Sequence, residues 1–122
     1  MKKTNIIRLN NAIFYGYHGN EHGEEALGGK YHIDVEIKTD FGAATETDNL
    51  DDTINYESVY RHVQHLVTEH RFYLIETLAQ RIVKVLLDKF PRIQSITVRV
   101  RKPGAPIHGV VDNVEVEIVE DR

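Results

Sequence analysis

The spacing of apolar residues changes twice along this chain, and this change limits the possible folds more than any other feature. Toward both ends, apolar residues alternate with polar ones, which is typical of β-strands with one buried face. The alternating positions are Tyr31, Ile33, Val35 and Ile37 in residues 31–41, Ile96, Val98 and Val100 in residues 95–102, and Val114, Val116 and Ile118 near the end. Residues 5–17 are also rich in strand-forming residues, and their interruption at Asn10-Asn11 predicts a bulge or bend.

The middle of the chain has the spacing of two amphipathic helices instead. The first apolar stripe contains Val59, Tyr60, Val63, Leu66 and Val67, and the second contains Ile75, Leu78, Ala79, Ile82, Val83 and Leu86. Tyr56 begins the first helix, and the second is expected from about Tyr73 to Phe90, because Pro91 cannot continue it. The short break at Arg71-Phe72 makes the two helices antiparallel neighbours.

The predicted order is therefore strand, strand, helix, helix, strand, strand. We expect an α+β fold: a two-layer sandwich in which a four-stranded antiparallel sheet carries two antiparallel helices on one face. With 122 residues, 41% of them hydrophobic, the chain has the size for one core, so residues 1–122 are predicted to form a single domain. Two open sheet edges favour pairing with other copies, and ring formation is a reasonable expectation.

The other face of the sheet is predicted to be polar and solvated. Its residues are His32, Asp34, Glu36, Lys38, Thr97, Arg99, Arg101, Glu115 and Glu117. A net charge of -4 with scattered signs argues against a nucleic-acid or membrane surface, so small molecules or other protein chains are the expected partners.

Several other site types are disfavoured by composition. The chain has no cysteine, which excludes disulfides and agrees with a reducing compartment. No long apolar run or leader pattern is present, so we expect a soluble, cytoplasmic protein. His62, His65 and Glu69 have helical ligand spacing but lie off the apolar stripe, so we expect no metal site.

Lys102 is the residue that most suggests a site. It ends a strand on the same side as Val98 and Val100, so a cation faces the core, and Pro103-Gly104 then stops the strand. The alternative is a lysine that extends back to solvent at a frayed strand end. Glu76 is its expected neighbour, because the second helix and the third strand are antiparallel and of similar length, about 21 and 23 Å. Alternatively, Glu76 only interacts with the helix dipole.

Two further residues are weaker candidates. Glu24 lies in the tip of the first hairpin, which the simplest chain tracing brings to the same end, although Glu24 and Glu25 alone read as solvated loop charges. Tyr56 should lie roughly 20 Å from Glu76, at the other end of its helix. It would therefore act in the site of a neighbouring subunit, unless it is only a half-buried aromatic residue next to the apolar stripe.

Short motifs along nearly the whole chain, in this order and spacing, resemble bacterial dihydroneopterin aldolases, which are tunnelling-fold pterin-binding proteins. The motifs are Phe14-Tyr15-Gly16-Tyr17-His18-Gly19, Glu24, Thr47-Asp48-Asn49-Leu50 with Tyr56, Leu74-Ile75-Glu76, Val98-Arg99-Val100-Arg101-Lys102-Pro103, and Ala105-Pro106-Ile107. The resemblance implies a homo-oligomer, a tetrameric ring stacked as an octamer, with sites between subunits and without a cofactor.

The resemblance also implies a role for each candidate. Glu76 would anchor the pterin by accepting hydrogen bonds from its 2-amino group and adjacent ring nitrogen. Lys102 would transfer protons, Tyr56 would come from the adjacent subunit, and Glu24 would hold the lysine, the substrate side chain or a water. Ile75 and Ile54 would contact the substrate.

The implied reaction is a retro-aldol cleavage of 7,8-dihydroneopterin, in folate biosynthesis, to 6-hydroxymethyl-7,8-dihydropterin and glycolaldehyde. The C=N bond of the dihydropterin accepts the electrons, so no Schiff base is needed and the lysine acts in proton transfer. Two alternatives stay open: a 7,8-dihydroneopterin 2′-epimerase, which the matching motifs disfavour, and a non-catalytic pterin-binding ring protein.

Overall fold

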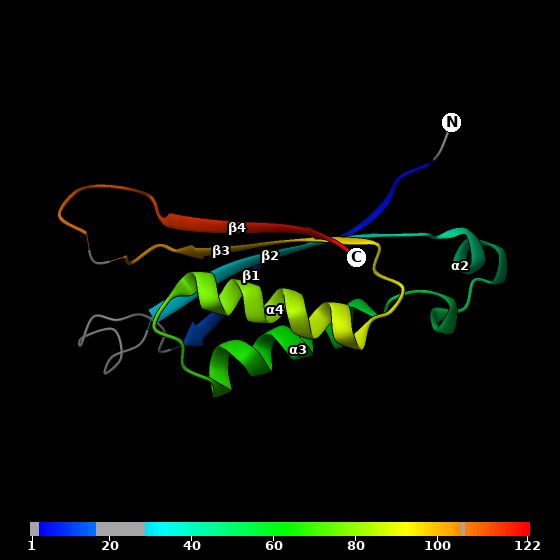
Figure 1. Cartoon of the computed structure of the whole chain (residues 1–122), viewed down its shortest axis with the longest axis horizontal. Coiled ribbons are helices and arrows are strands. Elements are labelled where there is room, and N and C mark those ends of the chain that lie inside the picture. Colours follow the sequence, from blue (N-terminus) through cyan, green and yellow to red (C-terminus); the bar gives the residue numbers. More distant parts are fainter. Residues whose placement is uncertain (1–2, 17–28, 106) are drawn as a thin grey trace.

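The computed structural model describes residues 3–16, 29–105 and 107–122. The main elements follow the predicted order, as Figure 1 shows: β1 (Asn5–Gly16), β2 (Gly29–Thr39), α3 (Tyr56–Glu69), α4 (Ile75–Lys89), β3 (Ser95–Lys102) and β4 (Val114–Asp121). Two short elements between β2 and α3 have no counterpart in the sequence pattern. These are α2 (Gly42–Thr47) and the 3₁₀ helix η1 (Leu50–Asp52).

The strands form one antiparallel sheet in the order β1-β2-β3-β4, which leaves β1 and β4 at its edges. The register sets Ile33 opposite Val100, so the alternating apolar residues of β2 and β3 share one face. The interruption predicted in the first strand is confirmed as a bulge, because the register shifts between Leu9 and Ala12 and Asn11 has a φ of 57°. An asparagine tolerates this left-handed conformation better than most residues.

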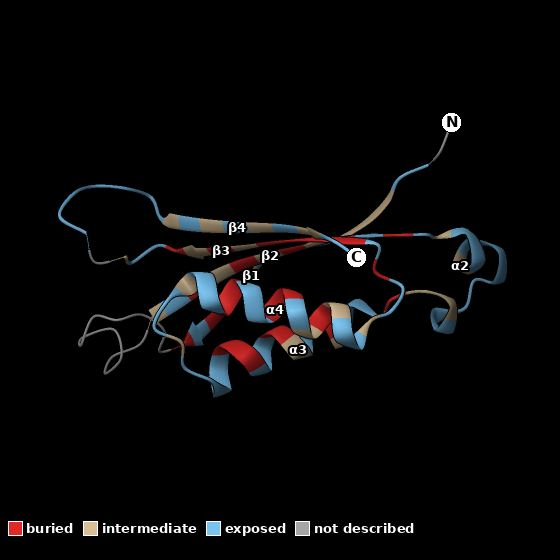
Figure 2. Cartoon of the chain, viewed as in Figure 1, coloured by how far each residue is buried: buried red, intermediate tan, exposed pale blue. Residues whose placement is uncertain are grey.

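Both long helices cover the same face of the sheet (Figure 1), α3 packing on β1 and α4 on β3 and β4. Asn55 begins α3 by accepting the backbone N–H groups of Glu57 and Ser58 with its side-chain oxygen. The buried residues lie between the helices and the sheet (Figure 2); in the helices they are Val59, Val63, Leu66 and Val67, and Leu78, Ala79, Ile82, Val83 and Leu86. The predicted two-layer α+β sandwich is confirmed.

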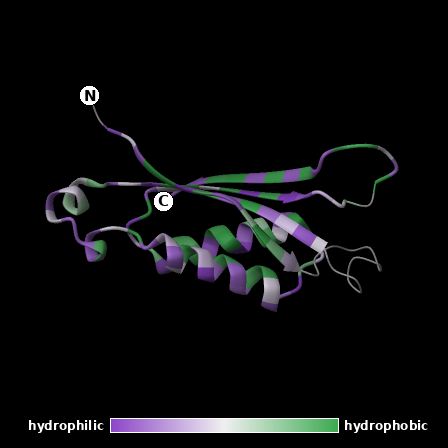
Figure 3. Ribbon diagram, turned by 180° about the vertical axis from the view of Figure 1, so that it is seen from behind, coloured by the Kyte–Doolittle hydropathy of each residue, from purple (hydrophilic) through white to green (hydrophobic). Residues whose placement is uncertain are grey.

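The other face of the sheet carries the expected polar residues, and apolar and polar residues alternate along the first part of β4 (Figure 3). The alternation ends after Ile118, because the exposed Val119 follows it. Many of the charges are paired across strands: Arg8 donates to Glu36, and Arg99 donates to Glu117. Thr97 was expected to be solvated, which is wrong, because it is buried. It lies on β3, inside the sheet, between Glu36 of β2 and Val119 of β4. In the described residues, no helix is long and apolar enough to cross a membrane.

Candidate functional site

Lys102 is the last residue of β3, and its side chain lies on the core face, as its position in the alternation predicts. Only 8% of the residue is exposed. Its Nζ lies 5.8 Å from the centroid of the Tyr31 ring, which is within the usual range of a cation–π contact. His32 pairs with Arg101, so Tyr31 and Lys102 follow as cross-strand neighbours on the opposite face. The cation is therefore held against an aromatic ring at the end of the sheet, which does not fit a frayed lysine in solvent.

Arg101, the residue before Lys102, projects from the opposite face of the sheet and is held by all three other strands. Two of its nitrogens donate to the two carboxylate oxygens of Asp34 on β2, at 2.7 and 2.8 Å. Further bonds of 3.2 Å reach Asn11 on β1 and Glu115 on β4. Hydrogen bonding from Arg101 holds the pKa of Asp34 below its ordinary value, against the opposing effect of burial. The same pairing raises the pKa of Arg101, so this network fixes the end of β3 that carries Lys102.

Glu76 is the second residue of α4, at the end of the molecule where β3 terminates (Figure 1), as the matched lengths predict. Its side chain is exposed and borders a shallow hollow on the outer side of α4 with Gln80, Arg81 and Lys84. The expectation that Glu76 faces the interior rim is therefore not met in one chain. Ile75, the residue before it, is half-buried and packs against the core. Glu24 lies outside the described residues.

Tyr56 begins α3 at the opposite end of the molecule (Figure 1), so it does not approach Lys102 or Glu76 of the same chain. It is 61% exposed, which excludes the alternative of a half-buried aromatic residue. Ile54, two residues earlier, is buried. Both border a groove of about 590 Å³ that is mostly apolar; its other lining residues are Ile7, Arg8, Leu9, Phe41, Ala44, Thr45, Asp48, Leu50 and Thr53. This groove runs along the outer strand β1.

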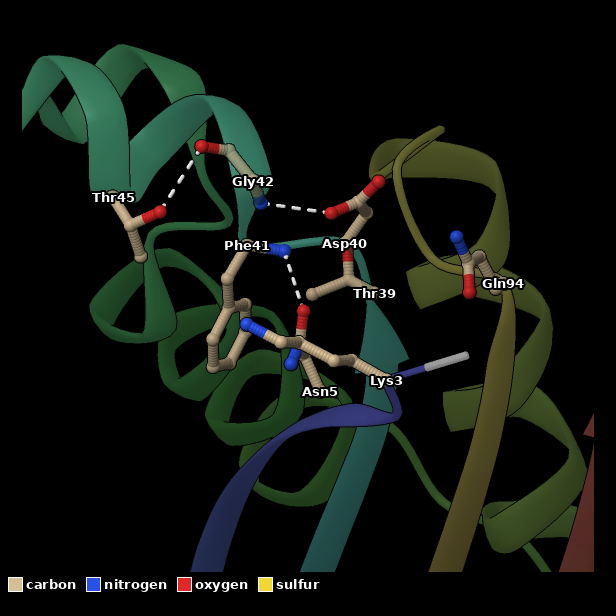
Figure 4. A pocket seen from close by; sticks show the side chains of 8 residues that line it. All are labelled: Lys3, Asn5, Thr39, Asp40, Phe41, Gly42, Thr45 and Gln94. Carbon is tan, nitrogen blue, oxygen red and sulfur yellow. Dashed lines mark hydrogen bonds between the residues drawn. The ribbon is translucent and has the colours of Figure 1, made fainter. Parts of the chain in front are cut away.

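A polar pocket of about 550 Å³ lies beside this groove, where β1, β2 and α2 meet (Figure 4). Its polar groups are largely bonded to one another. The side-chain oxygen of Asn5 accepts the N–H of Phe41, and Asp40 accepts the N–H of Gly42 (Figure 4). These hydrogen bonds hold the turn after β2, and the bond to Asn5 attaches the start of residues 41–55 to β1.

The histidine-rich face of α3 shows ordinary local contacts. His62 bonds the carbonyl of Ser58 in the preceding turn, and His65 pairs with Glu69. Nε2 of His65 lies 3.4 Å from Nε2 of His70. No group of three or more histidine or acidic side chains in the described ranges is arranged to hold a metal ion.

The sequence pattern did not identify several residues that hold the candidate side chains in place but are not candidates themselves. Tyr31 was assigned only to the core, although its ring underlies Lys102. Asn55 could have been found, because an asparagine directly before an apolar helical stripe is a helix-start signal. Two other residues carry no such signal, because their hydrogen bonds join segments that are far apart in the sequence. Arg92 donates to the carbonyl of Asp52, and Asn5 accepts the N–H of Phe41.

Comparisons with known proteins identify the family and the fold of this chain. The model of the FolB family, described as dihydroneopterin aldolase, matches residues 7–119. A dihydroneopterin aldolase of Staphylococcus epidermidis is 39% identical over 119 residues, which cover 98% of each chain. One of Bacillus subtilis is 39% identical over 109 residues, covering 89% of this chain and 91% of the relative. The crystal structure of E. coli dihydroneopterin aldolase in complex with neopterin superposes with a TM-score of 0.88 at 25% identity, covering 95% of this chain and 98% of that one.

Proposed function

Because this chain belongs to the dihydroneopterin aldolase family and has its tunnelling fold, we propose that it cleaves 7,8-dihydroneopterin in a site shared by two copies. The products are 6-hydroxymethyl-7,8-dihydropterin and glycolaldehyde. The observation that carries the proposal is the buried amine of Lys102, which lies at the same end of the fold as the carboxylate of Glu76. An amine on the core face of a strand is costly to bury, so its position suggests a chemical role.

The two sets of candidate residues belong to opposite edges of the sheet. Lys102 lies next to the edge strand β4, and Glu76 is on α4, which packs over β3 and β4. Tyr56 and Ile54 border the groove along the other edge strand, β1. If β1 of one copy pairs with β4 of the next, the half of the site at one edge meets the complementary half at the other.

A staggered pairing accounts for the separation of the two sets along the strands. β1 and β4 run antiparallel within the sheet, so each can extend the sheet of a neighbour in the same manner. Closing a sheet into a barrel requires such a stagger between strands. Setting the first half of β1, which borders Tyr56, against the first half of β4, which borders Lys102, brings both side chains to one site. A tetrameric ring, stacked as an octamer, is the assembly that we infer.

In this site Glu76 binds the pterin ring. A carboxylate accepts two hydrogen bonds side by side, which matches the row of donors formed by the 2-amino group and the adjacent ring nitrogen. The exposure of Glu76 in a single chain is consistent with a ligand that binds between copies. Ile75 and the neighbour's Ile54 would supply apolar contacts to the ring. The E. coli relative was crystallised with neopterin, which supports a pterin as the ligand.

The chemistry assigned to Lys102 is proton transfer. Removal of the proton from the 2′-hydroxyl allows the C1′–C2′ bond to break, which releases glycolaldehyde. The electron pair of that bond moves into the C=N system of the ring, which takes up a proton at N5. The enamine-like intermediate is then protonated at C1′, and N5 gives up its proton, which restores the C=N bond of the product. Each step needs a group that can give or accept a proton, and Lys102, Tyr56 of the neighbour and Glu24 are proposed to provide them.

The absence of cysteine suits a reducing compartment, so we place this activity in the cytoplasm.

The direct test is to incubate the chelator-treated protein with 7,8-dihydroneopterin and assay glycolaldehyde. We expect stoichiometric glycolaldehyde and 6-hydroxymethyl-7,8-dihydropterin. Formation of the 2′-epimer alone would identify an epimerase. Binding without any conversion would identify a non-catalytic pterin-binding protein, and both results contradict the aldolase proposal.

The shared site has a separate test based on mixing two impaired variants. Tyr56→Phe and Lys102→Ala each damage one half of the site, and subunit exchange should create sites in which both halves are intact. For random exchange of equal amounts, about a quarter of the sites regain both residues. Mixed oligomers without any recovered activity contradict a site between subunits.

A further inference from the structure

The helices α2 and η1, which lead to Ile54 and Tyr56, have little apolar packing of their own, although Ile54 itself is buried in the core. Neither α2 nor η1 contains a buried residue. Such a segment would be expected to open locally, because few buried contacts oppose its motion. A residue donated to a neighbour's site must nevertheless be held in one position, since small displacements of reacting groups are costly for catalysis. Contacts from outside α2 and η1 must therefore hold these two elements.

Arg92 makes that connection. It lies in the turn between α4 and β3, and its guanidinium donates to the carbonyl oxygen of Asp52 at 2.9 Å and to that of Asp51 at 3.2 Å. These are backbone groups of η1, 40 and 41 residues earlier in the chain. The planar guanidinium can serve two adjacent acceptors at once, which the single ammonium of a lysine does less well.

The turn that carries Arg92 is itself fixed to the sheet. The hydroxyl of Thr39, at the end of β2, donates to the carbonyl of Arg92 at 2.8 Å, and Thr39 is buried. The N–H of Gln94 donates to the carbonyl of Lys38. These hydrogen bonds, which we call the Arg92 clamp, connect the sheet through Arg92 to η1. The helix η1 ends two residues before Ile54 and four residues before Tyr56.

We propose that Arg92 is a positioning residue for the half-site that each chain donates to its neighbour. Arg92 acts through the η1 carbonyls and does not touch the substrate. This inference rests on the proposed shared site, because it assumes that Tyr56 works in the neighbouring subunit. Its consequence is specific: loss of Arg92 damages the neighbour's site and leaves the lysine half of its own chain intact.

Arg122 offers a matched control within the same chain. It is also exposed, and it donates to the carbonyls of Leu87, Phe90 and Ile93 around the same turn. None of these carbonyls belongs to η1. Arg122→Ala thus removes an arginine that bonds this turn without removing the link to the Tyr56 segment.

The first measurement compares steady-state kinetics of Arg92→Ala, Arg92→Lys and Arg122→Ala. We expect Arg92→Ala to lower kcat/KM by about 10- to 100-fold, as for a modest misplacement of a reacting group. Arg92→Lys should recover part of this loss, and Arg122→Ala should stay near the wild-type value. Equal losses in both alanine variants would mean that only the stability of the turn matters, and no loss in Arg92→Ala would also overturn the proposal.

Subunit mixing then tests in which half of the site the defect lies. Mixed oligomers of Arg92→Ala with Lys102→Ala should regain activity, because the defects lie in different halves. Mixed oligomers of Arg92→Ala with Tyr56→Phe should not, because both defects lie in the donated half. The opposite pattern contradicts the assignment. Failure of the reference pair, Tyr56→Phe with Lys102→Ala, would instead count against the shared site itself.

Hydrogen exchange tests the clamp independently of any activity. The N–H groups of Asp52 and Thr53 bond to the carbonyls of Asn49 and Leu50. These amides should exchange at least several-fold faster in Arg92→Ala than in the wild type, and Arg122→Ala should leave them unchanged. Unchanged exchange in Arg92→Ala would show that Arg92 does not hold this segment, whatever the substrate is.

Discussion

The two ends of the molecule present their candidate residues in different ways. At one end, Lys102 is 8% exposed and lies against Tyr31, which is 1% exposed, within the register of regular strands. At the other end, Tyr56 is 61% exposed and follows two short helices that bury no residue. The first end is built by the hydrophobic core. At the second end only Ile54 reaches the core, and the rest is held by hydrogen bonds that Asn5 and Asn55 accept and Arg92 donates.

This difference explains how one chain can carry two halves of a site. At the lysine end, strand register and core packing within one chain fix Lys102 and Tyr31. The tyrosine end leaves an apolar groove and an exposed ring at a sheet edge, which are surfaces that another chain can cover. The predictions below separate the two ends by their effects on turnover, on binding and on stability.

Lys102→Ala should have the largest effect of all. Loss of a positioned proton-transfer group lowers kcat by about 10²- to 10⁴-fold. Pterin binding, measured by calorimetry or fluorescence titration, should change little, because the ring is assigned to Glu76. Loss of binding with retained turnover of the bound substrate would reverse the roles of the two residues.

Glu76→Ala should weaken binding more than chemistry. A hydrogen bond to a charged group contributes about 1.5 to 3 kcal/mol, so the Kd for the pterin should rise by roughly one to two orders of magnitude. Glu76→Gln serves as the matched variant, because it keeps the shape but loses the charge and one acceptor position. A Kd for Glu76→Ala that equals the wild-type value removes Glu76 from the binding site.

Asp34→Asn should reduce stability in a pH-dependent manner. The pKa of Asp34 is below its ordinary value of 3.8 in the folded chain, chiefly through hydrogen bonding from Arg101, so the pairing stabilises the fold above that value. The contribution is lost as the pH falls through the folded pKa. Denaturant unfolding should show a less stable variant at pH 7, by about 1 to 3 kcal/mol, and a shrinking difference below about pH 4. A difference that stays constant with pH would contradict this account.

Tyr31 variants test whether the aromatic ring holds the lysine. Tyr31→Phe keeps the ring face and should retain most of the turnover. Tyr31→Leu removes it, and a lost cation–π contact of about 0.5 to 2 kcal/mol predicts a fall in kcat of roughly two- to thirty-fold. Thermal unfolding of both variants provides the control for core packing. Equal kcat values in two folded variants would leave the ring with only a packing role.

Asn55→Ala should have the smallest effect, confined to the tyrosine end. Asn55 accepts the N–H groups of Glu57 at 3.0 Å and Ser58 at 3.4 Å. Loss of such a helix cap costs about 1 kcal/mol, measurable by denaturant unfolding. In mixed oligomers, any loss of activity should follow the Tyr56 half of the site. Recovery on mixing with Tyr56→Phe, but not with Lys102→Ala, would assign Asn55 to the lysine half instead.

The sequence predicted the regular part of the molecule well. The period of two residues identified the strands, and the helical period identified α3 and α4, because the burial of one face requires these spacings. The same reasoning found Lys102, since a cation at an apolar position of a strand is visible without a structure. It could not find α2 or η1, which have no apolar stripe and depend on turn geometry and on polar contacts.

By itself, the sequence determined the order of the elements, the buried face of each one and the presence of a cation at a core position, because all three follow from local spacing. The tertiary structure decided which residues meet: the Tyr31 ring with Lys102, the Arg101 network across four strands, and Arg92 with carbonyls 40 and 41 residues earlier. Contacts between distant segments depend on the register of the sheet and the path of the connections, and no local pattern encodes these. The opposite positions of Tyr56 and Lys102 follow from that path, and they are the reason to look for the complete site between two chains.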